Sequence, residues 1–413
     1  MKIAAVIAEY NPFHNGHLYQ LNKIRKEHGA DRIIVVMSGD FAQRGIPTIV
    51  DKHIRARMAL ECGADLVLEL PVYYALGSAE YFAQGAVALL DKLGVVDILH
   101  FGSEAGDISL LNRCASILAK EPAEYSIALK AYLQQGLSYP TARSHALSTY
   151  IGADDNVLAE TLNSPNNILG IEYIKALLQR NSRIQPVTLA RSGSGYNETE
   201  LTQGQFASAN AIRSQLASDY GTLAQLYHYI PPAVSRILSE DSMQHFLFAN
   251  DFSSILYYKL LEECNRGYSL YYDVTEPISD KIIKNIGTFT GFDEFCMLNK
   301  SKDLTYNRIS RCLMHILLNM KQDTIEALRA DDYIHYARIL GFRKRSSNLL
   351  SSIKSNASIP LISKLADAYK EFDGPALTSL EADLYAAKVY EGVKALKYKV
   401  PIQNEFTRQI PII

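Results

Sequence analysis

Residues 1–20 read MKIAAVIAEYNPFHNGHLYQ, and this stretch decides the fold. Residues 2–8 are a short continuous apolar run, which is typical of a strand buried on both faces of a parallel sheet. A polar segment with the string HNGH at residues 14–17 follows, and it leads into a helical pattern at residues 17–28 that ends at Gly29. We therefore predict a strand, a polar loop and a helix as the first unit of an α/β domain.

The same alternation of strand and helix continues over the first two hundred residues. Further apolar runs predict buried strands at residues 32–37, 66–70, 96–101 and 184–190, of which the last is expected to be the final strand. Helical patterns lie between and after them, at residues 51–62, 78–93, 107–150, 164–179 and 208–217. Short apolar strands that alternate with helices are typical of a doubly wound parallel sheet, which is the fold class we predict here.

Beyond about residue 225 the strand pattern fades. Helical spacing prevails there, for example at residues 308–320 and 361–369. We therefore predict two domains: an α/β catalytic domain over residues 1–220, and a mainly α-helical domain over residues 221–413.

The composition of the 413-residue chain is that of an ordinary globular protein, with 48% hydrophobic and 21% charged residues. A net charge of −2 excludes a uniformly basic nucleic-acid coat and an acidic tail protein. Its five cysteines are scattered singly, which favours free thiols in a reducing compartment over a disulfide framework. No stretch approaches 18 uninterrupted apolar residues, so we expect a cytoplasmic protein without a membrane span.

The HNGH string is the strongest chemical signal. It follows the first strand directly, and in parallel sheets ligands bind at the carboxyl ends of the strands, where helix N-termini attract anions. His14 and His17 are expected to donate to phosphate oxygens as negative charge builds, and Gly16 to let a phosphate approach the backbone. Asn11 is expected to shape the loop ahead of them. A bare HxGH string is common by chance, so its position after the strand carries the prediction of a nucleotide site.

Two other polar segments are candidates for the same edge of the sheet. In the string SANAIR, Ser208 could offer donors at a helix N-terminus and Arg213 could hold phosphates, although a capping serine beside a surface arginine is the plainer alternative. Asp40 follows the second strand and could anchor Mg²⁺ through water, position an acceptor amine or accept its proton, whereas most loop aspartates only cap a turn. Arg44 in the same segment could bind a triphosphate.

A local basic excess marks residues 300–354, where eleven Lys or Arg stand against five Asp or Glu. Arg308, Arg311 and His315 share one stripe of a helix, and residues 343–345 are a short basic cluster. This pattern favours an RNA surface, with a solvated helix face as the alternative. Three tyrosines nearby could stack on bases: Tyr306, Tyr333 and Tyr336. No Cys/His array has metal-ligand spacing, so no resident metal is predicted, and no GxSxG string indicates a serine hydrolase.

A strand followed by HxGH resembles the nucleotidylyltransferase superfamily, whose members cleave ATP between its α and β phosphates. Five further strings make the resemblance more specific: MSGDFAQRGIP, GADLVLELP, HFGSE, SPNNILGIEY and FASANAIR, in this order. Together they look like the tRNA(Met) cytidine acetate ligase family. The resemblance runs through roughly the first 215 residues and continues more weakly beyond them, and it implies a Rossmann-like nucleotidylyltransferase domain.

The resemblance implies a ligase that activates acetate with ATP and Mg²⁺ to acetyladenylate. The acetyl group then passes to the wobble cytidine in the anticodon loop of elongator tRNA(Met), giving N4-acetylcytidine. Matched motif by motif, it implies an ATP site formed by the loop around Ile7–Gln20, which includes Ile7, Asn11, Gly16 and Gln20, together with Gly102, Asn167 and Arg191. The chemistry of the residues argued above adds Ser208 and Arg213 to this site and gives three catalytic candidates, His14, His17 and Asp40.

For three of these residues a plainer alternative stays open. Gly102 could be an ordinary turn glycine, Asn167 could bond its own backbone, and Arg191 could be a solvated loop cation. Two other functions share the same N-terminal features. A nucleotidylyltransferase acting on a small phosphorylated metabolite would not need some 190 further residues, and a non-catalytic RNA-binding factor that senses ATP would not need an intact HNGH string.

Overall fold

The computed structural model describes residues 1–137, 139–152, 161–162, 164–191, 206–217, 223–240 and 245–413. Its centre is a seven-stranded sheet with the strand order β7-β6-β1-β2-β5-β8-β9, and β3 and β4 pair separately as a small antiparallel hairpin. The five strands from β7 to β5 run parallel to one another. The strands are β1 Ile3–Ala8, β2 Arg32–Ser38, β3 Phe41–Ala42, β4 Ile46–Pro47, β5 Leu66–Leu70, β6 Ile98–Ser103, β7 Gln185–Ala190, β8 Ala337–Phe342 and β9 Leu361–Ile362.

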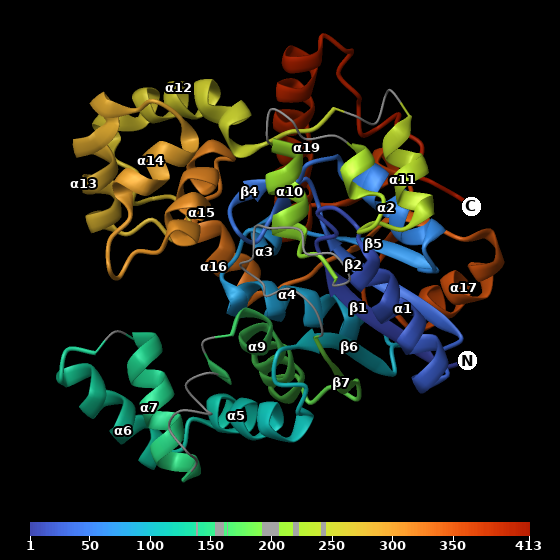
Figure 1. The fold of residues 1–413 in the computed structure, drawn as a ribbon, viewed down its shortest axis with the longest axis horizontal. Helices are drawn as coiled ribbons and strands as arrows, with labels where there is room; N and C mark the ends of the chain where they lie inside the picture. The colour runs from blue at the N-terminus through green and yellow to red at the C-terminus, as the bar shows by residue number, and fades with distance from the viewer. Residues whose placement is uncertain (138, 153–160, 163, 192–205, 218–222, 241–244) are drawn as a thin grey trace.

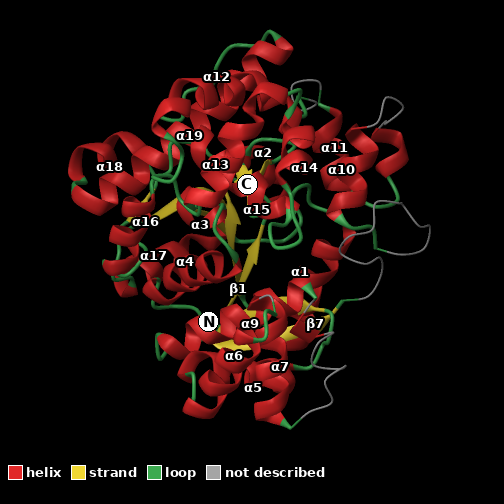
Figure 2. Cartoon of the chain, turned by 90° about the vertical axis from the view of Figure 1, so that its left-hand side faces the viewer, coloured by secondary structure: helices red, strands yellow, loops and turns green. Residues whose placement is uncertain are grey.

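Helices surround this sheet and make up most of the chain (Figures 1 and 2). The first half contains α1 Asn15–His28, α2 Lys52–Glu61, α3 Val72–Ala75, α4 Ala79–Lys92, α5 Ile108–Lys120, α6 Ala123–Gln134, α7 Tyr139–Ile151, α9 Pro165–Gln179 and α10 Ala209–Ala217. The second half contains α11 Pro232–Ser239, α12 Ser253–Glu263, α13 Glu276–Asn285, α14 Phe292–Asn299, α15 Tyr306–Leu317, α16 Gln322–Ala330, α17 Ser347–Asn356, α18 Leu365–Glu371 and α19 Gly374–Tyr398. Among the described residues, no helix combines the length and the apolar character that crossing a membrane requires.

The apolar strand runs are continuous because both faces of the sheet are buried. Along β1, Ala4 and Val6 pack into a cluster with residues of α1 and α2. Ile3 and Ala5 point to the other face and pack into a second cluster with residues of α4 and α9. Successive side chains of a strand alternate between faces, so helices on both sides demand an apolar residue at each position. The predicted doubly wound α/β fold with a mainly helical remainder is confirmed.

The prediction that residues 184–190 form the last strand is wrong. Residues 337–342 form β8, which pairs antiparallel with β5, and β9 pairs with β8. The expected helix at residues 361–369 is correspondingly split into β9 and α18. The second half of the chain therefore completes the sheet of the first half. The domain boundary near residue 220 stays a prediction.

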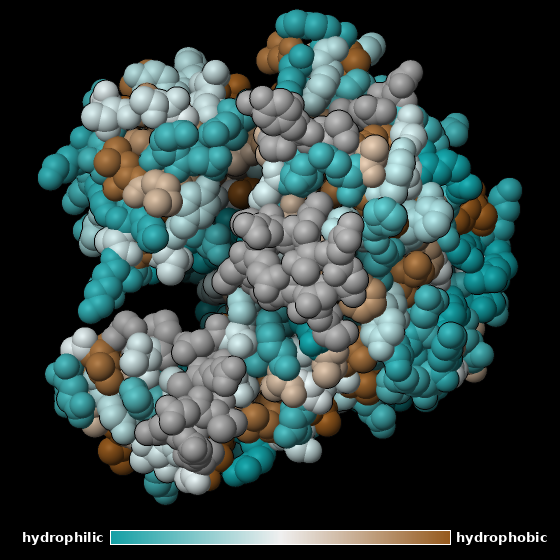
Figure 3. Space-filling model, in the orientation of Figure 1, coloured by the Kyte–Doolittle hydropathy of each residue, from teal (hydrophilic) through white to brown (hydrophobic). Residues whose placement is uncertain are grey.

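Two helical lobes project to the same side of the sheet. One comprises α5 to α7, and the other comprises α12 to α15 (Figure 1). In the space-filling view a deep notch separates them (Figure 3).

Candidate active site

The predicted polar segments meet in one pocket at the carboxyl edge of the parallel strands. The pocket contains about 980 Å³ of empty space, part of which is open to solvent. Most of the residues predicted for the site line it: Ile7, Asn11, His14, His17, Gln20, Gly102, Arg191, Ser208 and Arg213. Gly16, Asp40 and Asn167 do not line it. The lining residues come from the ends of β1, β6 and β7, from the β3–β4 turn, and from helices α1, α4, α9 and α10.

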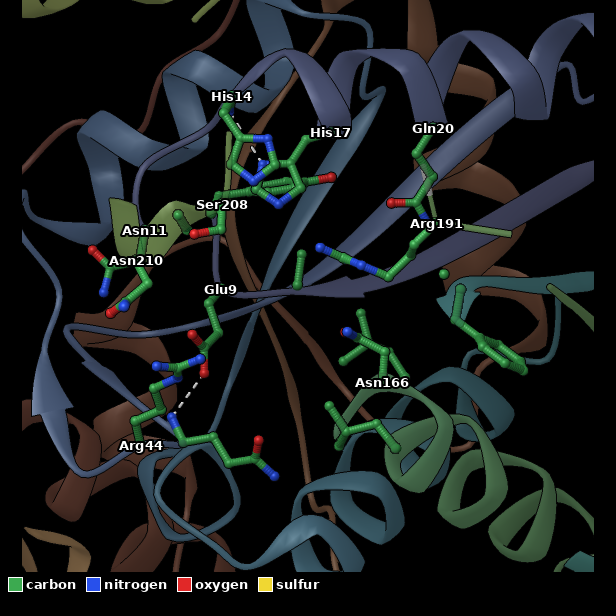
Figure 4. A pocket seen from close by; sticks show the side chains of 18 of the residues that line it. Glu9, Asn11, His14, His17, Gln20, Arg44, Asn166, Arg191, Ser208 and Asn210 are labelled. Atoms are coloured by element: carbon green, nitrogen blue, oxygen red, sulfur yellow. Dashed lines mark hydrogen bonds between the residues drawn. The ribbon is translucent and has the colours of Figure 1, made fainter. Parts of the chain in front are cut away.

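His14 and His17 are fixed by the first turn of α1. The backbone N–H of Gly16 donates to Nδ1 of His14 at 3.1 Å, and the backbone N–H of His14 donates to Nδ1 of His17 at 3.2 Å. The two rings stack with centroids 3.6 Å apart (Figure 4). The ring of Tyr10 packs edge-on against His17, with the ring centroids 4.7 Å apart. Both Nδ1 atoms therefore act as acceptors, and a neutral ring in this position carries its proton on Nε2.

Burial and neighbouring cations keep both rings neutral. Burial, together with the charges of Arg191 and Arg213, lowers the pKa of His14 to about 3. Burial, with contributions from His14 and Arg191, lowers the pKa of His17 well below its usual value. The pair can therefore donate two N–H groups to an anion at neutral pH without first taking up protons.

The depressed pKa of His14 predicts an acid-labile fold. In the unfolded chain the ring takes up a proton near pH 6.5, whereas in the folded protein it stays neutral down to about pH 3, so protons favour unfolding. The contribution is present above pH 6.5 and is lost as the pH falls. Urea unfolding between pH 6 and pH 4 should show the free energy of unfolding of the His14→Ser variant falling less steeply than that of the wild type. The expected difference is about 1.4 kcal/mol per pH unit, and equal slopes would contradict a neutral buried His14.

Gly16 lies under the ring of His14. An ideal Cβ at this position would lie 3.0 Å from Cε1 and 3.1 Å from Nδ1 of His14. The ring therefore fills the space that a side chain at position 16 would need, and the approach of a phosphate to the backbone there stays a prediction. The glycine is needed because the ring folds back over the first turn of the helix.

Gly16→Ala is therefore expected to displace the ring of His14 and to lower the catalytic rate by about 10²-fold, as misplacement by about 1 Å can do. The free energy of unfolding should stay equal or rise, because alanine favours a helix by up to about 1 kcal/mol over glycine. Gly392→Ala in α19 is the matched control, since nothing lies within 4 Å of its ideal Cβ. Turnover and urea unfolding measure the two effects, and an active Gly16→Ala enzyme would contradict the assigned packing.

The loop between β1 and α1 is tied to α10. Tyr10 turns the chain with a left-handed φ of 48°, a conformation that is strained for a bulky residue. Asn11 accepts the backbone N–H of Ile49 through Oδ1 at 2.9 Å, and its carbonyl oxygen accepts from the Arg213 guanidinium at 2.8 Å. Ser208 accepts the N–H of Ala211 at 3.0 Å, as an N-terminal cap does. The HNGH and SANAIR segments are therefore in contact, although one N–H group of the Arg213 guanidinium already bonds the loop.

The opposite wall is built on β6 and β7. Gln20 donates from Nε2 to the carbonyl oxygen of His100 at 3.2 Å. The backbone N–H of Arg191 bonds the carbonyl oxygen of Ser103 at 2.9 Å, and an ideal Cβ on Gly102 would lie 3.3 Å from Cγ of Arg191. Because Gly102 has no side chain, the side chain of Arg191 can pass over it. Figure 4 shows the position of Arg191 in the pocket.

Asn167 holds a loop together. Its Oδ1 accepts the backbone N–H of Ala105 at 3.0 Å, and its own N–H donates to Glu104 at 2.9 Å. The neighbouring Asn166 lines the pocket. The side chain of Asn167 therefore bonds the backbone of Ala105 rather than its own backbone, and its role at the ATP site stays a prediction. Asn166 was missed although it stands in the same motif.

Asp40 lies outside the pocket, in a buried ion cluster. Its Oδ1 accepts the backbone N–H of Lys52 at 2.8 Å, and its Oδ2 lies 3.7 Å from Nζ of the same lysine. Burial raises its pKa against the opposing charge of Lys52. Lys52 also contacts Glu69 at 2.8 Å and Glu405 at 3.2 Å. This placement favours a structural role for Asp40, as the link between the turn after β2 and α2.

Besides Asn166, two further groups of lining residues were not predicted. The first is Glu9, which directly follows β1. The second is an apolar wall formed by Phe82, Phe101, Leu169 and Tyr173. Nothing local in the sequence distinguishes these four from ordinary core residues, because strands and helices distant in sequence bring them together.

The predicted RNA surface over residues 300–354 does not form as a continuous stripe. Arg308 pairs with Asp273 at 3.0 Å, and the ring of His315 is buried against Tyr272 at 4.5 Å. Tyr336 is also buried, and its hydroxyl donates to Asp383 at 2.6 Å. The cluster at residues 343–345 follows β8, whose last residue pairs with the first residue of β5, so it lies at the edge of the sheet opposite the pocket. His315 and Tyr336 are thus core residues, and their predicted RNA role is wrong.

Comparison with known proteins assigns the family. The model of the family described as HIGH Nucleotidyl Transferase matches residues 1–405. A tRNA(Met) cytidine acetate ligase of Acetivibrio thermocellus is 40% identical to this chain over the full length of both proteins. The chain belongs to the tRNA(Met) cytidine acetate ligase family. The family suggested by the sequence strings is thereby confirmed.

Solved structures agree with this family and with the fold. A crystal structure of apo TmcAL from Thermotoga maritima superposes with a TM-score of 0.92 at 31% identity, covering 100% of this chain and 99% of the other. A second form of TmcAL, bound with alpha-thio ATP, gives a TM-score of 0.90 at 30% identity and covers all of both chains. This member of the tRNA(Met) cytidine acetate ligase family accordingly has the sheet of a Rossmann-like nucleotidyltransferase.

Proposed function

We propose that this protein uses ATP and acetate to acetylate the wobble cytidine of elongator tRNA(Met), with acetyladenylate as the intermediate. The observation that carries the proposal is a pocket built around the neutral His14–His17 pair, in a chain that matches named ligases over its whole length. A similar fold binds alpha-thio ATP in TmcAL, which supports ATP as the nucleotide.

In the first step a carboxylate oxygen of acetate attacks the α-phosphorus, and the bond to the β-phosphate oxygen breaks. The Nε2–H groups of His14 and His17 face the developing charge, and the N-terminus of α1 adds its dipole. Arg191 and Arg213 provide positive charge in the same pocket. This site therefore lowers the barrier by positioning and charge stabilisation.

Mg²⁺ fits the site as an ion that ATP brings with it. Among the described residues, no group of three His, Cys, Asp or Glu side chains could hold a metal by itself, and Glu9 is the one carboxylate among the described lining residues. The phosphate oxygens would therefore be its principal ligands. When bound, Mg²⁺ neutralises charge on the pyrophosphate.

The second step takes place on an unpaired base. A wobble cytidine lies in the anticodon loop, where single-stranded bases can be splayed out and read by their edges. Its exocyclic amine then attacks the acetyladenylate carbonyl and AMP leaves. The alternative, nucleotidyl transfer to a small phosphorylated metabolite, is not favoured by the names of the full-length relatives.

Exchange of labelled pyrophosphate into ATP tests the first step without tRNA. We expect exchange only when acetate is added, because formation of acetyladenylate is what makes pyrophosphate release reversible. Exchange without acetate, or ATP consumption that depends on a phosphorylated metabolite instead, would contradict the proposal.

A further inference from the structure

The acetyl transfer proposed above releases one proton, and the pocket must supply a group to take it. The amine of cytidine carries two hydrogens, and the acetylated product keeps one of them on nitrogen. A general acid–base group has to lie within hydrogen-bond reach of that nitrogen, directly or through one water. The following inference rests on the proposed function.

The two histidines do not suit this task. Each Nδ1 already accepts a backbone N–H, at 3.1 Å for His14 and 3.2 Å for His17. Each neutral ring therefore carries its proton on Nε2, and it meets the substrate as a donor. Taking a second proton would place an imidazolium beside Arg191 and Arg213, in a buried site.

Asp40 is not in reach of the pocket. Its carboxylate is buried, and it contacts the backbone N–H and Nζ of Lys52. Glu104, at the end of β6, is occupied by the backbone N–H groups of Asn166 and Asn167, and it does not line the pocket. Of the lining residues that the structure describes, Glu9 alone carries a carboxylate.

Glu9 is held in a defined position with one oxygen to spare. The backbone N–H of Gln43 donates to its Oε1 at 2.9 Å, and its carbonyl oxygen accepts from Arg55 at 2.7 Å. Its Oε2 accepts no hydrogen bond within the part of the chain that the structure describes. Figure 4 shows the Glu9 carboxylate pointing into the pocket with Arg44 beside it, on the opposite side from Arg191.

We propose that Glu9 is the catalytic base of acetyl transfer, with Oε2 receiving the proton of the cytidine amine. The lone pair of the amine nitrogen forms a bond to the acetyl carbonyl carbon, and the bond from that carbon to the phosphate oxygen breaks. AMP leaves with the electron pair of that bond. The N–H proton passes to the Glu9 carboxylate and then to solvent, so that the carboxylate is restored.

The test separates the two half-reactions in Glu9→Gln. The amide keeps an oxygen that can accept the N–H of Gln43, so the β3–β4 turn should stay in place. Acetate-dependent pyrophosphate exchange should remain within about threefold of the wild type, since acetate needs no base in that step. Single-turnover acetyl transfer at saturating tRNA should fall by about 10²–10⁴-fold, which is the usual contribution of a general base. Glu27→Gln, on the exposed face of α1, is the matched control.

Two further readouts distinguish a base from a structural residue. Transfer by Glu9→Gln should recover in part as the pH is raised from 7 to 9, because hydroxide then removes the proton. Glu9→Asp, which keeps a carboxylate, should transfer faster than Glu9→Gln. The proposal would be overturned if Glu9→Gln transferred acetyl groups at the wild-type rate. It would also be overturned if exchange and transfer fell equally, because Glu9 would then act in adenylation. Absence of exchange in the wild-type protein would instead overturn the proposed function, and it needs no variant to be seen.

Discussion

Replacing His14 by alanine is expected to slow acetate-dependent pyrophosphate exchange by about 10²–10³-fold, the usual cost of one preorganised donor. The variant loses the Nε2–H that we propose to face the developing charge at the α-phosphorus. It also loses the Nδ1 acceptor that caps Gly16, so the free energy of unfolding should fall by about 1 kcal/mol.

His14→Ser separates these two effects. A serine hydroxyl can cap the helix, as serine commonly does at this position, but it is too short to replace the ring in the pocket. We expect the serine variant to keep its stability at neutral pH and to be as inactive as the alanine variant. Exchange at saturating ATP and acetate measures the loss. An active serine variant would show that His14 serves only as a helix cap.

The second large effect is expected in the buried ion cluster. Lys52→Met should lower the free energy of unfolding by about 3–5 kcal/mol, because it removes one of the two cations, Lys52 and Arg338, that pair with the buried carboxylates of this cluster. Nζ of Lys52 lies 2.8 Å from Glu69, 3.2 Å from Glu405 and 3.7 Å from Asp40. The lysine thereby joins α2 to β5, to the turn after β2 and to the C-terminal segment.

Urea unfolding of matched variants checks this expectation. Lys23→Met removes an exposed pair with Glu27 and should cost less than about 1 kcal/mol. Adding Glu405→Gln to Lys52→Met should restore part of the loss, since one uncompensated charge is then removed. A loss below about 1 kcal/mol in Lys52→Met would contradict a structural role for the cluster.

The first unit of the fold was predictable because its signals are local. The apolar run of β1, the HNGH string and the helix end at Gly29 lie within 29 residues, and both histidines are placed by hydrogen bonds inside one helical turn. The motif at Ser208 and Arg213 was also predictable, since strand-end geometry gathers such segments at one edge.

The errors have non-local causes. Strand β8 lies among helices in sequence, and its partner β5 is some 270 residues away, so no nearby pattern predicts the pairing. Asp40 belongs to a buried ion cluster that also contains Glu405, a residue of the distant C-terminal segment. The packing of the His14 ring over Gly16 was not predicted either, because it depends on how the side chains pack.

Transfer of labelled acetate to RNA is the direct test of the proposed ligase activity. The purified protein is incubated with ATP, Mg²⁺, labelled acetate and total tRNA, and the nucleosides are then separated by mass spectrometry. We predict label in N4-acetylcytidine from elongator tRNA(Met), formed about 10²–10³-fold more slowly by His14→Ser. ATP consumption without label in RNA would contradict the proposed acetylation of tRNA.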